Sequence, residues 1–341
     1  MTRRLRLVIL FMLFLQACGV NASTPTSTPT LIPTATLTPS PTPSPLATLL
    51  PTITPTPLPA VSRVLIVTFD GLRPDAIAAA GMTNVLSLMQ SGAYTLRAQT
   101  INPSLTLPAH ASMLTGTCPA KHIVRWNEYV PENGFALGAD IFDLAHASGL
   151  RTVLVAGKEK LRQVTEPGST DFFGFIDVTD KIKDITTLEN MAIEQIREGF
   201  GLMLMHFPDG DLAGHEYGWM SPGQLRAYKR DDDSFGLLLE VMKSRGMYDD
   251  TLIIVTSDHG GHDTTHGTEL PGDMTIPWVV SGPRIAPGEL QTQVYIMDTA
   301  ATIAFALGLP IPADWDGAPV YEAFGMPYDA SRAGGCPGVT P

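Results

Sequence analysis

Five short apolar runs recur along the chain between residues 63 and 282. They are RVLIVTF (63–69), RTVLVAG (151–157), GLMLMHF (201–207), TLIIVTS (251–257) and IPWVVSG (276–282). Each run is continuously hydrophobic, and longer segments with helical patterns separate the runs. This is typical of strands that are buried on both faces and joined by helices. We therefore predict an α/β fold, a three-layer sandwich with a mostly parallel central sheet and helices on both faces.

The start of the chain has a different pattern. Arginines at positions 3, 4 and 6 precede an apolar run from Leu7 to Leu15, which is typical of a secretory signal and too short to span a bilayer as a mature helix. The run ends in LQACG, which resembles a bacterial lipobox with Cys18 as the acylated residue. Cleavage after Ala22 also fits, and the arginine pair leaves twin-arginine export as a minor alternative. We expect an exported, cell-surface or periplasmic protein, bound to a membrane through lipidated Cys18.

A segment rich in Thr, Pro and Ser separates this signal from the apolar runs. It extends from about residue 23 to 59, and its prolines remove backbone donors and fix φ, so we expect an extended, partly polyproline II spacer. At ~3.1 Å per residue this spacer would reach on the order of 100 Å. The chain then divides into a signal peptide (1–18), a disordered linker (19–60), a catalytic domain (61–328) and a flexible tail (329–341).

The charge balance limits the partners. The chain has 22 Lys and Arg residues against 34 Asp and Glu, a formal net charge of −12. Binding of a nucleic acid duplex requires a basic surface that neutralises phosphates, and we do not expect such a partner. Acidic residues are suited to metal coordination instead. The sequence does not indicate an oligomeric state.

Carboxylate and imidazole side chains follow three of the apolar runs. Ligands of parallel sheets bind at the carboxyl ends of the strands, so we expect these side chains to converge. Such a ligand set suits Zn²⁺, with Mn²⁺ or Fe as possible substitutes. Glycines beside each cluster allow sharp turns of the backbone. The residues are Asp70, Asp211, His215, Asp258, His259 and His266.

The motifs around these residues resemble those of the alkaline phosphatase superfamily. They are VTFDG (67–71), T-x-P-x-H from Thr106, D-x-x-G-H (211–215), SDHG (257–260) and HG (266–267). The chain looks most like the nucleotide pyrophosphatase/phosphodiesterase branch, whose nucleophile is Thr rather than Ser. The similarity covers most of residues 61–320 and implies an alkaline phosphatase-like fold.

The resemblance also implies the chemistry of the site. It predicts a metal-dependent phosphoric ester hydrolase that forms a covalent phosphothreonine at Thr106, with Asn127 binding the phosphate. Two divalent ions, most simply Zn²⁺ and roughly 3.5 to 4 Å apart, clamp the attacking and leaving oxygens in such sites. One ion would bind Asp211, His215 and His266; the other would bind Asp70, Asp258 and His259, with Thr106 as a further ligand.

Several neighbouring residues have weaker assignments. Lys158 and Lys160 resemble the paired lysines that phosphonoacetate hydrolases of this superfamily use on their substrate, and a solvated helix start is the alternative. We expect His110 to pack or to support the site. We expect His262 to hydrogen-bond a metal-binding side chain, and Asp209 to be a turn residue.

Several activities are compatible with these residues. A phosphodiesterase is favoured over a phosphomonoesterase, because no Arg or third carboxylate set marks a site for a dianion. A C–P hydrolase resembling phosphonoacetate hydrolase is a further alternative, and the substrate would be a small phosphate ester or phosphonate. A sulfatase is disfavoured because CPAK at 118–121 does not match C-x-P-x-R. A non-catalytic, surface-anchored binding protein is the alternative from another class, although the complete ligand set and nucleophile favour an enzyme.

Two cysteines remain if Cys18 is lipidated. An exported protein allows Cys118 and Cys336 to form a disulfide. Such a bond would hold the C-terminal tail near the loop that leads to Asn127.

Overall fold

The structure is a computed structural model that describes residues 61–177, 181–327 and 334–337. The predicted signal peptide and linker lie outside the described residues, as does most of the predicted tail. No helix in the described part of the chain has both the length and the apolar character that crossing a membrane requires.

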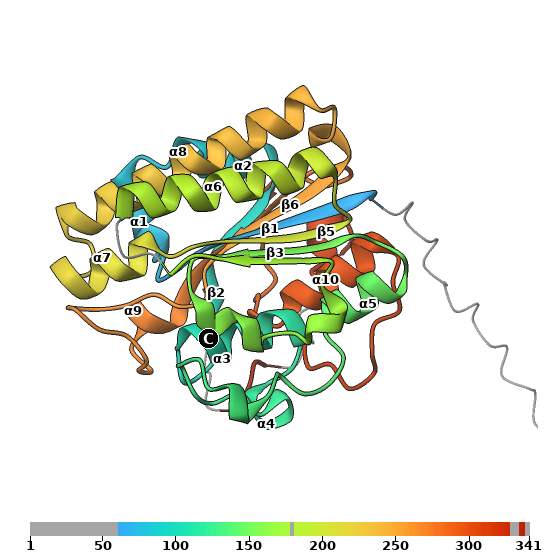
Figure 1. The fold of residues 1–341 in the computed structure, drawn as a ribbon, viewed down its shortest axis with the longest axis horizontal. Coiled ribbons are helices and arrows are strands. Elements are labelled where there is room, and N and C mark those ends of the chain that lie inside the picture. Colours follow the sequence, from blue (N-terminus) through green and yellow to red (C-terminus); the bar gives the residue numbers. More distant parts are fainter. Residues whose placement is uncertain (1–60, 178–180, 328–333, 338–341) are drawn as a thin grey trace, which may run out of the picture. The chain divides into compact units, whose positions relative to one another are not determined.

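Eight strands of the described residues form one sheet in the order β4–β3–β5–β1–β6–β7–β2–β8 (Figure 1). Strand β7 runs antiparallel to β6 and β2, and every other neighbouring pair is parallel. The predicted mostly parallel sheet is therefore confirmed. The strands are β1 (Arg63–Phe69), β2 (Ala93–Gln99), β3 (Thr152–Ala156), β4 (Phe172–Phe175), β5 (Leu202–Phe207), β6 (Thr251–Thr256), β7 (Thr275–Ser281) and β8 (Gly288–Glu289).

Helices cover both faces of this sheet, as the alternation of strands and helical segments predicts (Figure 1). The first face carries α1 (Pro74–Ala80), α2 (Thr83–Ser91), α6 (Lys181–Glu198) and α8 (Pro222–Ser244). The second carries α3 (Thr106–Thr115), α5 (Ile141–Ala147) and α10 (Asp298–Leu307). The remaining helices are α4 (Pro119–His122), α7 (Asp209–Tyr217) and α9 (Pro271–Met274), with 3₁₀ turns at Pro131–Asn133, Glu159–Gln163, Pro167–Ser169, Tyr248–Asp250 and Tyr321–Phe324.

The central strands supply a core on each face. In β1, Leu65 and Val67 belong to the cluster under the first helical layer, whereas Val64 and Ile66 belong to the cluster under the second. All four side chains are fully buried. Successive side chains of a strand point to opposite faces, so a strand buried on both sides is apolar at consecutive positions, as residues 64–67 are.

A disulfide joins Cys118 and Cys336, with their Cα atoms 5.5 Å apart. The predicted pairing is confirmed. Cys336 is buried and belongs to the short described stretch Gly334–Pro337 of the predicted tail. The bond therefore fixes this stretch beside the loop that follows α3.

Candidate metal centre and active site

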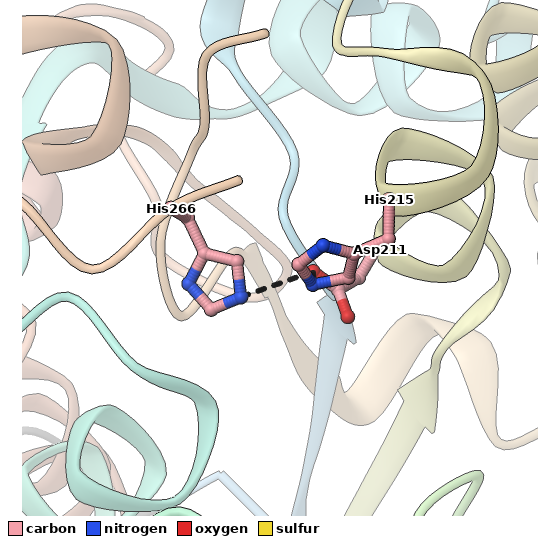
Figure 2. Close-up of side chains that lie close together, drawn as sticks. All are labelled: Asp211, His215 and His266. Atoms are coloured by element: carbon pink, nitrogen blue, oxygen red, sulfur yellow. Dashed lines mark ion pairs between the residues drawn. The ribbon is translucent and has the colours of Figure 1, made fainter. Parts of the chain in front are cut away.

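The first group of ligands combines helix α7 with a distant loop. Asp211 and His215 lie four residues apart on α7, which follows β5 directly, so both side chains lie on one face of the helix. The Oδ1 atom of Asp211 lies 3.4 Å from His215 Nε2 and 3.5 Å from His266 Nε2. Figure 2 shows the imidazole of His266 reaching from its loop towards the two α7 side chains. These are the three residues that the sequence predicts for one ion.

The second group lies at the carboxyl ends of β1 and β6. His259 Nε2 lies 3.4 Å from Asp70 Oδ1 and 3.3 Å from Asp258 Oδ2. All three side chains are fully buried. Asp211 lies between the two groups, because its carboxylate is also within 4.8 Å of ligand atoms of Asp70 and His259. The structure thus brings all six predicted ligands into one double cluster.

Main-chain carbonyls orient the three imidazoles of the cluster. The Nδ1 atoms of His215, His259 and His266 lie 2.9, 2.8 and 2.9 Å from the carbonyl oxygens of Thr264, Gly260 and Ser104, respectively. A carbonyl only accepts, so each Nδ1 carries the proton and each Nε2 presents a lone pair to the cluster. This is the tautomer that a metal-binding imidazole requires.

The carboxylates have a matching arrangement, since each has one oxygen held by the protein and one without a partner. Asp258 Oδ1 accepts hydrogen bonds from the main-chain N–H groups of Gly71 and His259. Asp70 Oδ2 accepts from His206. The other oxygens, Asp70 Oδ1, Asp211 Oδ1 and Asp258 Oδ2, are buried with no hydrogen-bond partner among the described residues.

These unpartnered oxygens fit the binding of metal. Each faces an imidazole Nε2 at 3.3–3.5 Å. Two ligands at about 2.0–2.1 Å from one tetrahedral ion would be separated by about 3.3 Å. A buried carboxylate oxygen without a donor costs free energy unless a cation meets it, so the donor set and its spacing both fit divalent metal binding.

The charges of the cluster shift its pKa values in opposite directions. Burial, followed by the charge of Asp70, raises the pKa of Asp258 to about 7. Burial also pushes the pKa of Asp70 and of Asp211 upward, but the Lys158 ammonium leads the opposing charges that hold both below their ordinary value. Three carboxylates in one buried space repel one another, which is the situation that divalent cations relieve.

Thr106 lies beside the second group of ligands. It is buried and begins helix α3, with its Oγ1 3.3 Å from His259 Nε2. Pro108 lies in the first turn of this helix, where no N–H is required. The hydroxyl thus stands at a helix N-terminus, where backbone N–H groups favour an anion.

Asn127 reaches the same helix terminus from the following loop. Its Oδ1 accepts a hydrogen bond from the Leu107 main-chain N–H at 2.9 Å. This contact uses the amide oxygen, so the Nδ2 hydrogens of Asn127 remain as donors near the start of α3. The arrangement is consistent with the predicted contact to a phosphate.

Lys158 makes two ion pairs inside the cluster. Its Nζ lies 2.7 Å from Asp70 Oδ2 and 2.6 Å from Asp211 Oδ2. Burial lowers the pKa of this lysine, but the charges of Asp211 and Asp70 prevail and raise it above its ordinary value. Lys160 is half-buried, and burial, followed by the charge of Lys158, lowers its pKa. Lys158 is therefore not a solvated helix residue.

His206 is a site residue that the sequence analysis misses. It is fully buried in β5, and its Nδ1 lies 3.1 Å from the Gly157 N–H, so Nε2 carries the proton and donates to Asp70 Oδ2 at 2.9 Å. The imidazole thereby orients one metal-binding carboxylate. A single polar residue at the end of an apolar strand run, as in LMLMHF, is the signal that would have indicated it.

The supporting residues show one agreement and two corrections. His110 supports the site as expected, with Nδ1 donating to the Thr106 carbonyl and Nε2 contacting Thr68 Oγ1. The expected partner of His262 is wrong, because its Nδ1 lies 2.7 Å from Asp273, which is not a metal-binding candidate. Asp209 is not a turn residue. It is buried in the first turn of α7, where a negative charge is favourable, and it pairs with Arg230.

The residues of this site lie in segments that match a known protein family. The model of the family described as "Type I phosphodiesterase / nucleotide pyrophosphatase" matches residues 64–137 and 151–272, more than half of the chain. The chain belongs to this family. The matched segments include every residue of the double cluster, as well as Thr106, Asn127 and both lysines.

Curated relatives are longer than this chain. GPI ethanolamine phosphate transferase 2, catalytic subunit, of Homo sapiens is 27% identical over 282 residues, 76% of this chain and 27% of that protein. Ectonucleotide pyrophosphatase/phosphodiesterase family member 3 of Rattus norvegicus is 24% identical over 219 residues, 59% of this chain and 25% of that protein. The chain thus spans about a quarter of the length of these two relatives.

Solved structures confirm the fold. Murine ectonucleotide pyrophosphatase / phosphodiesterase 5 superposes with a TM-score of 0.62 at 14% identity, covering 77% of this chain and 99% of that chain. A 2-O GAG sulfatase superposes with a TM-score of 0.67 at 15% identity, covering 78% of this chain and 75% of that chain. The alkaline phosphatase-like fold of the family is therefore present here.

Proposed function

We propose that the chain is a metal-dependent phosphoric ester hydrolase of the phosphodiesterase type, acting through a covalent phosphothreonine at Thr106 with two bound divalent ions, most simply Zn²⁺. One observation carries this proposal. Three buried carboxylates each present an unpartnered oxygen to an imidazole Nε2 within 3.5 Å, and the Thr106 hydroxyl lies beside them. Family membership supports the same class of reaction.

The chain's own residues have defined tasks in this reaction. Asp211, His215 and His266 would hold one ion, and Asp70, Asp258 and His259 the other. Bound there, the ions supply positive charge that polarises the phosphoryl group and lowers the pKa of the Thr106 hydroxyl. Thr106 Oγ1 loses its proton to water and forms the bond to phosphorus while the bond from phosphorus to the leaving oxygen breaks, and that oxygen takes a proton from water. A second water then attacks phosphorus, which releases the remaining phosphate ester and restores the Thr106 hydroxyl.

Hydrogen-bond donors of the protein lie where they could bind the negatively charged oxygens of the transferred phosphoryl group. The first N–H groups of α3 have no partner within the helix, and the Asn127 amide is oriented beside them by its contact with Leu107. Fixed donors aimed at developing charge typically account for a 10²- to 10³-fold gain in rate each. Asn127 and the helix terminus would therefore bind the non-bridging oxygens.

A cavity of about 330 Å³ lies between segments that follow Asn127 and Lys160, and we propose that it takes the organic group of a diester. The loop after Asn127 and the segment after Lys160 both contribute to its wall, and Gln163 joins these two segments by hydrogen bonds to Val130 and Gly134. Its apolar and aromatic surface suits the organic group of a leaving alcohol. The lining residues are Tyr129, Phe135, Arg162, Thr165, Pro167, Thr170 and Phe173.

A second candidate activity has a specific observation in its favour. Lys160 has no ion pair with Asp70 or Asp211 among the described residues and lies close enough to feel their charges, so its ammonium suits the dianion of a phosphate monoester or a phosphonate. A phosphomonoesterase or a C–P hydrolase resembling phosphonoacetate hydrolase is therefore the alternative within the same fold.

The test compares kcat/KM of the Zn²⁺-loaded protein for bis(p-nitrophenyl) phosphate and p-nitrophenyl phosphate. We expect the diester to be preferred, and Thr106→Ala to reduce kcat by at least about 10³-fold without loss of bound metal. Thr83→Ala is the matched control, because Thr83 also begins a helix but is exposed. A strong preference for the monoester would overturn the diesterase assignment, and an active Thr106→Ala variant would overturn the covalent mechanism.

A further inference from the structure

The ion pairs of Lys158 connect the two groups of metal ligands. Its ammonium contacts Oδ2 of Asp70, which belongs to one group, and Oδ2 of Asp211, which belongs to the other. The oxygens that face the imidazoles are the opposite ones, Oδ1 in both residues. Lys158 therefore contacts the two carboxylates on the side that the predicted metals do not use.

The backbone holds Lys158 in this place. It follows β3, and β5 lies between β3 and β1 in the sheet. Gly157 donates its N–H to His206, the imidazole that also binds Asp70. A Cβ atom at Gly157 would lie 2.3 Å from Pro208, so only glycine allows this close approach to the start of α7. The backbone of Lys158 is thus held in place by the same elements that carry Asp70 and Asp211.

The ammonium of Lys158 compensates part of the negative charge of the buried carboxylates. Lys158 is the one Lys or Arg side chain that pairs with Asp70, Asp211 or Asp258 in the described part of the chain, and its side chain is only 12% exposed. Uncompensated buried carboxylates are strongly unfavourable. The ammonium offsets part of the charge that a pair of divalent ions would otherwise have to meet.

We propose that Lys158 is a resident counter-ion of the metal centre rather than a substrate-binding lysine. It stabilises the fold while metal is absent, and it opposes the arrival of the ions by its own positive charge. The inference rests on the proposed metal sites. It fixes the direction of two changes on removal of the ammonium. The metal-free protein must be destabilised more than the metal-loaded protein, and metal must therefore bind more tightly.

The test uses Lys158→Met, which keeps the length of the side chain and removes the charge. Thermal unfolding in EDTA and calorimetric titration with Zn²⁺ are measured without any substrate. We expect the melting temperature of the metal-free variant to fall by roughly 5–10 °C, and Zn²⁺ to bind on the order of tenfold more tightly than in the wild type. At saturating Zn²⁺ the difference in melting temperature should become small.

Two further variants make the result specific. Lys160→Met removes the neighbouring lysine, which has no ion pair to these carboxylates among the described residues and feels their charges only at longer range, and it should change both quantities much less than Lys158→Met. Lys158→Arg keeps the charge and should preserve most of the stability in EDTA. If Lys158→Met folds only when Zn²⁺ is supplied, the counter-ion role is supported in its strongest form.

Other outcomes would overturn the inference. Weaker Zn²⁺ binding by Lys158→Met would show that the lysine orients ligands instead of competing with the metal. Unchanged stability and Zn²⁺ affinity together with a higher KM would assign it to the substrate. Wild-type protein that binds no divalent metal would overturn both this inference and the proposed function, whereas tight Zn²⁺ binding without ester hydrolysis would count against the function alone.

Discussion

At the scale of single residues, main-chain hydrogen bonds set the tautomer of five histidines. His215, His259 and His266 give their Nδ1 proton to a carbonyl and present Nε2 as a lone pair. His206 and His122 have the reverse arrangement, because a main-chain N–H donates to Nδ1 and leaves Nε2 as the donor. The first three can therefore bind metal, whereas the other two support a neighbouring side chain, which is Ser112 for His122.

His122 also gives a prediction for stability. Burial, the largest influence, lowers its pKa from the ordinary 6.5 to about 4 in the folded protein. Between these values the unfolded chain binds the proton and the folded protein does not, so stability is complete above pH 6.5 and is lost as the pH falls towards 4. The full effect is about 3 kcal/mol. His122→Gln cannot titrate, so its free energy of unfolding should depend less on pH across this window.

The comparison is made by denaturant unfolding at several pH values between 4 and 7. The stability advantage of the wild type over His122→Gln should shrink as the pH falls, since only the wild type loses this contribution. His146→Gln is the control, because His146 is exposed. If the difference in free energy of unfolding between the wild type and His122→Gln stays constant from pH 4 to pH 7, the prediction is contradicted.

The identities of the site residues were more predictable than their contacts. Asp70, Asp211 and His259 stand in recognisable motifs at the ends of apolar runs, so the sequence alone places them at one edge of the sheet. The pairing of Lys158 with two of these carboxylates depends on the direction of a long side chain. Residue spacing carries no information on such a direction, and for this reason the sequence left its role open.

At the scale of elements, burial on both faces made the strands recognisable. Strands β1, β3, β5 and β6 are apolar at nearly every position and were predicted. Strand β2 mixes buried and partly exposed positions, and β4 and β8 contain four and two residues, so these three gave no clear signal. The reversed direction of β7 was not predicted either, since an apolar run has no direction.

Helix α7 depends on a close contact with α8 that a single methyl group would disturb. A Cβ atom at Gly210 would lie 1.9 Å from the ring of Tyr228 on α8. Tyr228 also donates to the Asp70 carbonyl, at 3.3 Å. Gly210→Ala should therefore destabilise the protein by about 1–3 kcal/mol and displace Asp211, the next residue. We expect a lower melting temperature and weaker binding of one of the two proposed metal ions.

Gly168→Ala is the matched control for this experiment. No atom lies within 4 Å of a Cβ built there, so the melting temperature and the Zn²⁺ content should be those of the wild type. Metal content is measured by elemental analysis after dialysis against Zn²⁺ at a concentration near the dissociation constant of the weaker proposed site, as determined for the wild type. Wild-type stability together with a full complement of metal in Gly210→Ala would refute the proposed role of the contact.

At the scale of the whole molecule, the site combines residues between positions 70 and 266, and the disulfide adds a still longer connection. The predicted signal peptide, spacer and lipidated Cys18 lie outside the described residues and remain predictions. They agree with the presence of a disulfide, because disulfides form and persist in oxidising compartments. In the sequence, only the expected compartment and the number of cysteines favour this pairing, since the distance between the two residues depends on the complete fold.

The disulfide closes a loop with a sequence separation of 218 residues. In the chain-entropy model, closure of a loop of this size lowers the conformational entropy of the unfolded state and so stabilises the folded state by about 5 kcal/mol. Cys336→Ser should therefore lower the melting temperature by about 10 °C, and Cys118→Ser should have the same effect. Dithiothreitol should lower the melting temperature of the wild type but leave both variants unchanged. If reductant destabilises the variants as much as the wild type, the loss comes from another source, and the bond does not provide the predicted stability.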